Sequence, residues 1–220
     1  YYMEKSIESI WKEGFLKKDA LVAPKLNNLY NQKSKHIIDK FQRMYQINRI
    51  AIAAFALIVL PVSFISKLPY LGVLMFIAFA IIIAVSGRFM KKLKAINTGD
   101  TSYQYLNSFN EFIKDLLSVN EKLSRFLYPY IFIAIILGFW FGDIGGNIPG
   151  KEFVSKLIVD YPDMQLVLGL PLIGIFGATF IIFILALFGG IIGTWDINLV
   201  YSGVIKKLEE LIGDMEELRN

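Results

Sequence analysis

The chain has 220 residues and no cysteine, and its 23 lysines and arginines against 19 acidic residues give a formal net charge of +4. Hydrophobic residues make up 55% of the sequence and charged residues only 19%, which excludes a soluble enzyme, a disordered chain and a disulfide scaffold. Four stretches carry no charged side chain, namely 50–66, 68–87, 126–142 and 164–195. This pattern predicts a polytopic membrane protein.

Each charge-free stretch is long enough to cross a bilayer. A helix rises about 1.5 Å per residue, so about 17–20 residues cover roughly 25–30 Å, the thickness of a hydrocarbon core. The fourth stretch is longer, and it contains Gly169 and Pro171 near its start. We therefore place the fourth span at 172–194 and leave 164–171 at the interface. The expected fold class is all-α, with four transmembrane helices whose helical cytoplasmic extensions form a bundle.

Residues 1–22 are predicted to form an amphipathic helix. Lysines alternate there with apolar residues, and the combination of basic side chains with a tryptophan suits the surface of the inner leaflet. The alternative is that this helix packs across the cytoplasmic bundle. The residues that we assign to the membrane surface are Trp11, Phe15, Lys17 and Lys18.

The next two segments are predicted to be a cytoplasmic helix continuing into the first span, over 24–66, and the second span with its cytoplasmic end, over 68–96. The first of them carries an apolar seam at steps of three and four, which is typical of coiled helices. Its members are Tyr30, Ser34, Ile37, Phe41, Met44 and Asn48.

A third cytoplasmic helix is expected to continue into the third span over 101–142. Its seam runs without a proline into the span. The polar Asn120 within it favours a role in fixing the register of a coiled seam rather than in binding a ligand. The cytoplasmic seam residues of this helix are Leu106, Phe109, Ile113, Leu116, Asn120 and Leu123.

Residues 143–163 are predicted to be an outer loop with a short amphipathic helix. The loop holds a group of carboxylates, Asp143, Glu152, Asp160 and Asp163, which are weak candidates for a Ca²⁺ or Mg²⁺ site. Their spacing matches no calcium-loop pattern, and charged loop residues are ordinarily just solvated. We therefore expect no metal and no cofactor.

The last segment, 164–220, is expected to be the fourth span continuing into a C-terminal cytoplasmic helix. Its cytoplasmic seam is Val204, Leu208, Leu211 and Met215. The span is rich in small residues, which let membrane helices approach closely. They serve either packing within the bundle, which we favour, or a dimer seam, and they are Gly174, Ala178, Ala186, Gly189, Gly190 and Gly193.

The distribution of basic residues predicts the orientation. Of the 23 lysines and arginines, 20 fall in segments 1–49, 88–125 and 196–220, and only Lys67, Lys151 and Lys156 fall on the other side. This asymmetry predicts cytoplasmic termini, in a cell inner or plasma membrane. The net charge is then explained without a nucleic-acid partner.

Motifs of catalysis are missing from the sequence. The spans contain no ionisable residue, the single histidine is His36, and no phosphate-binding glycine loop or nucleophile elbow is present. We therefore expect a non-enzymatic protein that regulates or scaffolds through protein contacts, with the bilayer and a protein partner or a second copy as partners. The alternatives are a transporter or channel for a lipid-like or small neutral solute and, third, a membrane enzyme with a metal in the outer loop.

Overall fold

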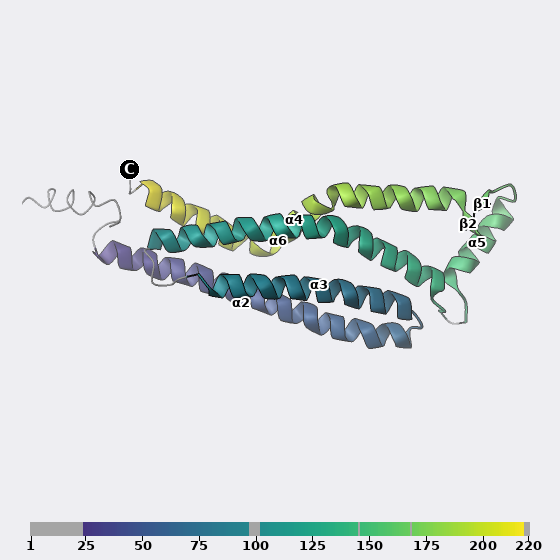
Figure 1. The fold of residues 1–220 in the computed structure, drawn as a ribbon, viewed down its shortest axis with the longest axis horizontal. Helices are drawn as coiled ribbons and strands as arrows, with labels where there is room; N and C mark the ends of the chain where they lie inside the picture. Colours follow the sequence, from purple (N-terminus) through teal and green to yellow (C-terminus); the bar gives the residue numbers. More distant parts are fainter. Residues whose placement is uncertain (1–23, 97–101, 145, 168, 218–220) are drawn as a thin grey trace, which may run out of the picture. The chain divides into compact units, whose positions relative to one another are not determined.

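The structure of the chain is a computed structural model that describes residues 24–96, 102–144, 146–167 and 169–217, with side chains from residue 31 onward. The predicted helix over 1–22, with Trp11, Phe15, Lys17 and Lys18, lies outside the described residues. Within the described residues there are five helices and two short strands (Figure 1), namely α2 (Pro24–Ile65), α3 (Pro69–Lys94), α4 (Ser102–Phe141), α5 (Pro149–Asp160), β1 (Leu166–Val167), β2 (Leu170–Pro171) and α6 (Leu172–Glu217).

Four of these helices, α2, α3, α4 and α6, are long and apolar enough to cross a membrane. The expected all-α fold with four membrane-spanning helices is thereby confirmed. Helices α2 and α4 continue through Pro61 and Pro129. Proline within a membrane helix is tolerated where neighbouring groups bind the freed backbone carbonyl.

The chain divides into two compact units, and α2, α3, α4 and α6 each contribute to both. The first unit contains the described residues up to Gln46, then Phe89–Leu116, and those from Ile197 onward. The second unit contains Ile47–Arg88 and Leu117–Asp196. All four charge-free stretches of the sequence lie in the second unit, so this unit contains the membrane-spanning segments.

The first unit has an aromatic core centred on Phe41, which is fully buried. The ring of Phe41 lies 4.9 Å from that of Tyr201 and 5.3 Å from that of Phe109, measured between ring centroids. Phe112 and Phe89 extend this cluster, with 5.9 Å between their centroids. Large buried aromatic rings dominate the energetics of a core, and tilted or edge-to-face pairs add to the stabilisation. This core joins α2, α3, α4 and α6 into a helical bundle.

In the second unit, neighbouring helices meet at glycines and small side chains. A Cβ atom added to Gly72 of α3 would fall 1.6 Å from the hydroxyl oxygen of Ser63 in α2, and one added to Gly138 of α4 would fall 2.6 Å from the Cβ atom of Leu71 in α3. The tight link between α2 and α3 passes through Lys67, whose φ of 57° is in the left-handed region. Large apolar side chains on the outside of these helices are exposed, as a hydrocarbon environment requires.

The segment 164–171, which we expected only to lie at the interface, contains a small antiparallel hairpin. Leu166 pairs with Pro171 and Val167 with Leu170, and Gly169 supplies a positive φ of 78° between the strands. Glycine adopts this conformation without steric cost. A charge-free run does not distinguish a strand from a helix, which is why the hairpin was missed.

Candidate functional site

Most of the predicted seam residues of α4 and α6 lie in the core of the first unit. Two predicted sets are buried there, Leu106, Phe109, Ile113 and Leu116 of α4 and Val204, Leu208, Leu211 and Met215 of α6. Asn120 and Leu123 are half-buried and belong to the second unit. The buried seam of α4 within the first unit therefore ends at Leu116.

The buried positions of α2 match the predicted seam only up to Phe41. Ser34, Ile37 and Phe41 are buried, but Met44 is half-buried and Asn48 is exposed. Tyr45 takes the buried position instead, because its ring stacks on Phe41 with 5.7 Å between centroids. The expectation that Asn48 lies in a buried seam was therefore wrong.

The hydroxyl of Tyr105 in the first unit has a shifted pKa. Burial of Tyr105 raises its pKa above the ordinary value of 10.0, and the nearby carboxylate of Asp39 adds to this rise. Both effects disfavour the phenolate. The hydroxyl therefore keeps its proton in the folded protein over the whole physiological range.

Helices α4 and α6 cross at three of the predicted small residues. A Cβ atom added to Gly189 would fall 2.9 Å from the carbonyl oxygen of Ser124, and one added to Gly193 would fall 2.1 Å from the hydroxyl oxygen of Ser124. At Gly190 an added Cβ atom would fall 2.7 Å from the Cγ atom of Glu121. These glycines are buried and pack within the chain against α4.

The other predicted small residues of α6 do not take part in this crossing. Gly174 and Ala186 are exposed and Ala178 is half-buried. A Cβ atom added to Gly177 would meet nothing within 4 Å, and one added to Gly174 would meet only Pro171, at 3.9 Å. This part of α6 therefore presents an open face of small residues in the described chain.

Polar side chains accompany the crossing of α4 and α6. The amide of Asn120 donates a hydrogen bond of 2.8 Å to the carbonyl of Gly193, and the hydroxyl of Tyr128 donates one of 3.1 Å to Asp196. Asn120, which we expected to fix the register of a coiled seam, is thus bonded to α6, and its effect on register stays a prediction. The Tyr128–Asp196 contact was missed, although both residues stand at ends of charge-free stretches, where a polar pair is expected.

Two of the four carboxylates in residues 143–163 have local partners. Asp143 lies 3.8 Å from the amine of Lys67 and accepts a hydrogen bond of 2.8 Å from the backbone N–H of Gly146. Glu152 pairs with Lys156 at 2.9 Å within α5, and this hydrogen bond raises the pKa of the Lys156 ammonium. In the described part of the chain, no three histidine or carboxylate groups are close enough to hold a metal ion. The structure thus does not bring Asp143, Glu152, Asp160 and Asp163 together.

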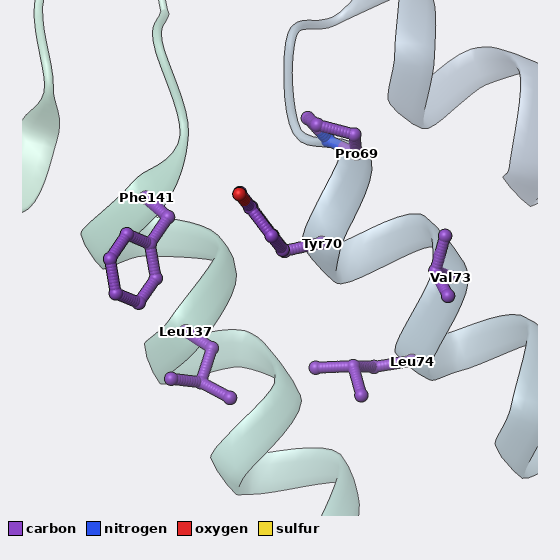
Figure 2. A pocket seen from close by; sticks show the side chains of 6 residues that line it. All are labelled: Pro69, Tyr70, Val73, Leu74, Leu137 and Phe141. Atoms are coloured by element: carbon purple, nitrogen blue, oxygen red, sulfur yellow. The ribbon is translucent and has the colours of Figure 1, made fainter.

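An apolar pocket of about 610 Å³ lies between the start of α3 and the end of α4. Figure 2 shows Tyr70 and Leu74 pointing from α3 toward α4, and Leu137 pointing back from α4. The rings of Tyr70 and Phe141 lie 5.5 Å apart. The pocket could hold an apolar group such as part of an acyl chain, and its lining residues are Pro69, Tyr70, Val73, Leu74, Leu137 and Phe141.

Two contacts between α4 and α3 lie beside this pocket. The hydroxyl of Tyr130 donates a hydrogen bond of 3.0 Å to the carbonyl of Leu74. Gly138 allows α4 to approach Leu71 of α3 closely, one turn from the pocket. Sequence reasoning missed these residues because apolar side chains of a span give no signal for which helix they face.

Comparison of the chain with protein families, with curated proteins and with solved structures gives no match. A functional interpretation therefore relies on the geometry described above. That geometry offers a charged helical bundle, a glycine-mediated helix crossing, an open face of small residues on α6 and an apolar pocket.

Proposed function

We propose that this chain is a non-enzymatic integral membrane protein that regulates or scaffolds a protein partner through its first unit. The observation that carries the proposal is the continuity of the helices. Each of α2, α4 and α6 runs without interruption from an apolar span into the aromatic bundle of the first unit. A change in lipid state or in an outer ligand that shifts a span would therefore move residues of the bundle as well.

The outer faces of the first unit are suited to contacts with a protein. Apart from Leu199 and Val200 at the start of its α6 segment, its apolar seams are buried, so contacts with a partner would be made mainly by the exposed charged faces. On α6, Glu209, Glu210 and Asp214 are exposed and form no ion pair in the described part of the chain. A partner with a basic surface would be attracted to this face.

Purification of the full chain from its own membranes tests the proposal. After mild crosslinking and detergent extraction, we expect one partner in a fixed ratio to the chain. The double substitution Glu209→Lys and Glu210→Lys should release the partner, because it reverses charge on an exposed face without touching the core. Lys151→Glu in the outer loop is the matched control and should leave the ratio unchanged. Recovery of the chain without any stoichiometric partner would contradict the proposal.

The proposed orientation places both termini and the first unit in the cytoplasm of a cell with this protein in its inner or plasma membrane. It is supported by the 20 basic residues on that side against three on the other. Because the chain lacks cysteine, single cysteines can report on it. An impermeant maleimide added to intact cells should label Lys151→Cys and not Asn107→Cys. Labelling of Asn107→Cys alone would show that the chain has the opposite orientation.

A second copy of the chain is the partner that we propose for the open face of α6. Gly174, Gly177 and Ala178 leave room for a close-packed helix, as small residues do in membrane helix pairs. Replacement of Gly177 by Leu should lower the fraction of chains that crosslink as dimers in a bilayer. The same replacement at Gly203, which also has open space around it but lies in the first unit, is the control.

The pocket of Figure 2 supports the second candidate, a transporter or channel for a lipid-like or small neutral solute. Leu137→Trp would fill the pocket, whereas Phe139→Trp places the same ring at an exposed position of α4. If the pocket carries the activity, transfer of a fluorescent lipid across reconstituted vesicles should fall with the first substitution only. Equal transfer by both variants and the unchanged chain would exclude this role for the pocket.

A further inference from the structure

The end of α3 concentrates positive charge directly beside an apolar span. Four basic residues, Arg88, Lys91, Lys92 and Lys94, fall within seven positions, immediately after the charge-free stretch 68–87. The whole of α3, Pro69–Lys94, contains no acidic residue. Clusters of four to eight basic residues next to a membrane span are typical of sites for anionic lipid headgroups.

The geometry of α3 places these charges opposite its buried side. Phe89, Met90 and Leu93 are buried in the first unit. Since successive residues are about 100° apart around a helix, Arg88 and Lys91 lie on the opposite face, and both are exposed. Lys94 is exposed as well. The charged face is therefore open to whatever lies beside the end of the span.

The neighbouring carboxylates are already engaged. Asp115 of α4 lies 2.6 Å from the amine of Lys92, which also sits 5.3 Å from the centre of the Phe89 ring. Glu111, the other acidic residue of α4 in the first unit, pairs with Lys114 at 3.1 Å. Arg88, Lys91 and Lys94 have no ion-pair partner among the residues that the structure describes.

We infer that Arg88, Lys91 and Lys94 bind the phosphate of an anionic phospholipid in the leaflet beside the end of α3. The guanidinium and the two ammonium groups supply donors and charge for a phosphate, and the apolar stretch that precedes them keeps the lipid chains alongside the span. Lys92 serves a different purpose, since Asp115 ties it to the bundle. The inference goes beyond the regulatory role and rests only on insertion of the chain in a bilayer.

Lysines at the end of a helix can also simply stabilise that helix. The experiment must therefore distinguish this role from lipid binding. Cations near the last turn stabilise the exposed carbonyl groups through the helix dipole. That role predicts a loss of helix stability when the lysines are replaced. It predicts no difference between anionic and zwitterionic lipids.

Native mass spectrometry of the full chain in detergent micelles resolves each bound lipid and gives its affinity. We expect phosphatidylglycerol to bind more tightly than phosphatidylcholine of the same chains. Each basic side chain near a membrane surface contributes roughly fivefold to binding an anionic lipid. Replacing both lysines, in Lys91→Gln with Lys94→Gln, should therefore weaken the binding of phosphatidylglycerol by about 25-fold and leave the binding of phosphatidylcholine unchanged.

Three further variants make the test specific. Lys206→Gln with Lys207→Gln removes the same charge from exposed positions of α6 well beyond its span, and should change neither affinity. Lys91→Arg with Lys94→Arg should retain the preference. Asp115→Asn frees the charge of Lys92 and should strengthen phosphatidylglycerol binding.

Equal affinities of the unchanged chain for the two lipids would overturn the inference. So would an equal loss of phosphatidylglycerol binding in the Lys206/Lys207 variant, since the effect would then be one of net charge. Either result leaves the proposed regulatory role standing, because that role is tested by the stoichiometry of a protein partner.

Discussion

The side-chain amide of Asn120 in α4 donates a 2.8 Å hydrogen bond to the backbone carbonyl of Gly193 in α6. The bond forms where a side chain on α6 would crowd the donor, because a Cβ atom added to Gly193 would fall 3.1 Å from the amide nitrogen of Asn120. The absence of a side chain at Gly193 therefore leaves room for the side chain of Asn120 where the two helices cross. We expect this pair to fix the longitudinal position of α4 against α6, as a polar residue at a helix interface commonly does.

Removal of this bond should destabilise the crossing modestly. Asn120→Ala deletes the donor and leaves the carbonyl of Gly193 without its side-chain partner. Hydrogen bonds between membrane helices contribute about 0.6 kcal/mol on average, and those of soluble proteins about 1 kcal/mol. We expect a loss in this range when unfolding is followed by circular dichroism in mixed micelles. Asn107→Ala, at an exposed position of α4, should show no loss.

Addition of a methyl group at Gly193 should cost more than removal of the Asn120 bond. In Gly193→Ala the new Cβ atom would fall 2.1 Å from the hydroxyl oxygen and 2.5 Å from the Cβ atom of Ser124. Overpacking of this kind costs about 1–3 kcal/mol. We expect a loss of that size in the same unfolding measurement.

Two variants identify the cause of this loss. Gly203→Ala places the same methyl group on α6 where nothing lies within 4 Å, and should be neutral or slightly stabilising. In the background of Ser124→Gly, which removes the clashing side chain, Gly193→Ala should cost much less. If Gly193→Ala is as harmless as Gly203→Ala, then α4 and α6 do not cross at Gly193.

The aromatic core of the first unit should depend on Phe41. Its ring is fully buried and contacts those of Tyr45, Phe109 and Tyr201. Truncation of a buried phenylalanine to alanine costs about 3–5 kcal/mol, because apolar contact is lost and a cavity remains. We expect Phe41→Ala to increase hydrogen exchange throughout the first unit. Leu199→Ala, at a position that is 83% exposed, should leave the exchange rates unchanged.

Much of the fold could be predicted from local sequence. The run of apolar residues from Leu172 to Trp195 has no charge, and span length follows directly from such a run. The seam of α4 up to Leu116 could be predicted because a buried helix face repeats at steps of three and four. These features depend on residues close together in the chain.

Features that depend on contacts between distant segments could not be predicted. Gly174 with Ala178 has the same spacing as Gly189 with Gly193, yet only the second pair meets α4. The difference lies in Ser124 and its neighbours on the opposite helix, which the sequence of α6 does not contain. For the same reason, the spacing of the outer carboxylates did not show that Asp143 pairs with Lys67.

Tyr105 should make the stability of the first unit depend on alkaline pH. Its pKa is raised in the folded chain by burial and by Asp39, so above about pH 10 the unfolded chain releases this proton before the folded chain does. The folded state then binds more protons than the unfolded state, and the free energy of unfolding falls as pH rises, by at most about 1.4 kcal/mol per pH unit. Below pH 10 the contribution of Tyr105 is constant.

The comparison of unfolding at pH 9 and pH 11 measures this dependence. Other groups titrate in the same range, so the informative quantity is the difference between variants, with Tyr105→Phe expected to lose less stability than the unchanged chain between the two pH values. Asp39→Asn should reduce the fall in part, since it removes the second cause of the shift and leaves burial in place. A fall of equal size in all three proteins would mean that the hydroxyl of Tyr105 is as well solvated in the folded chain as in the unfolded one.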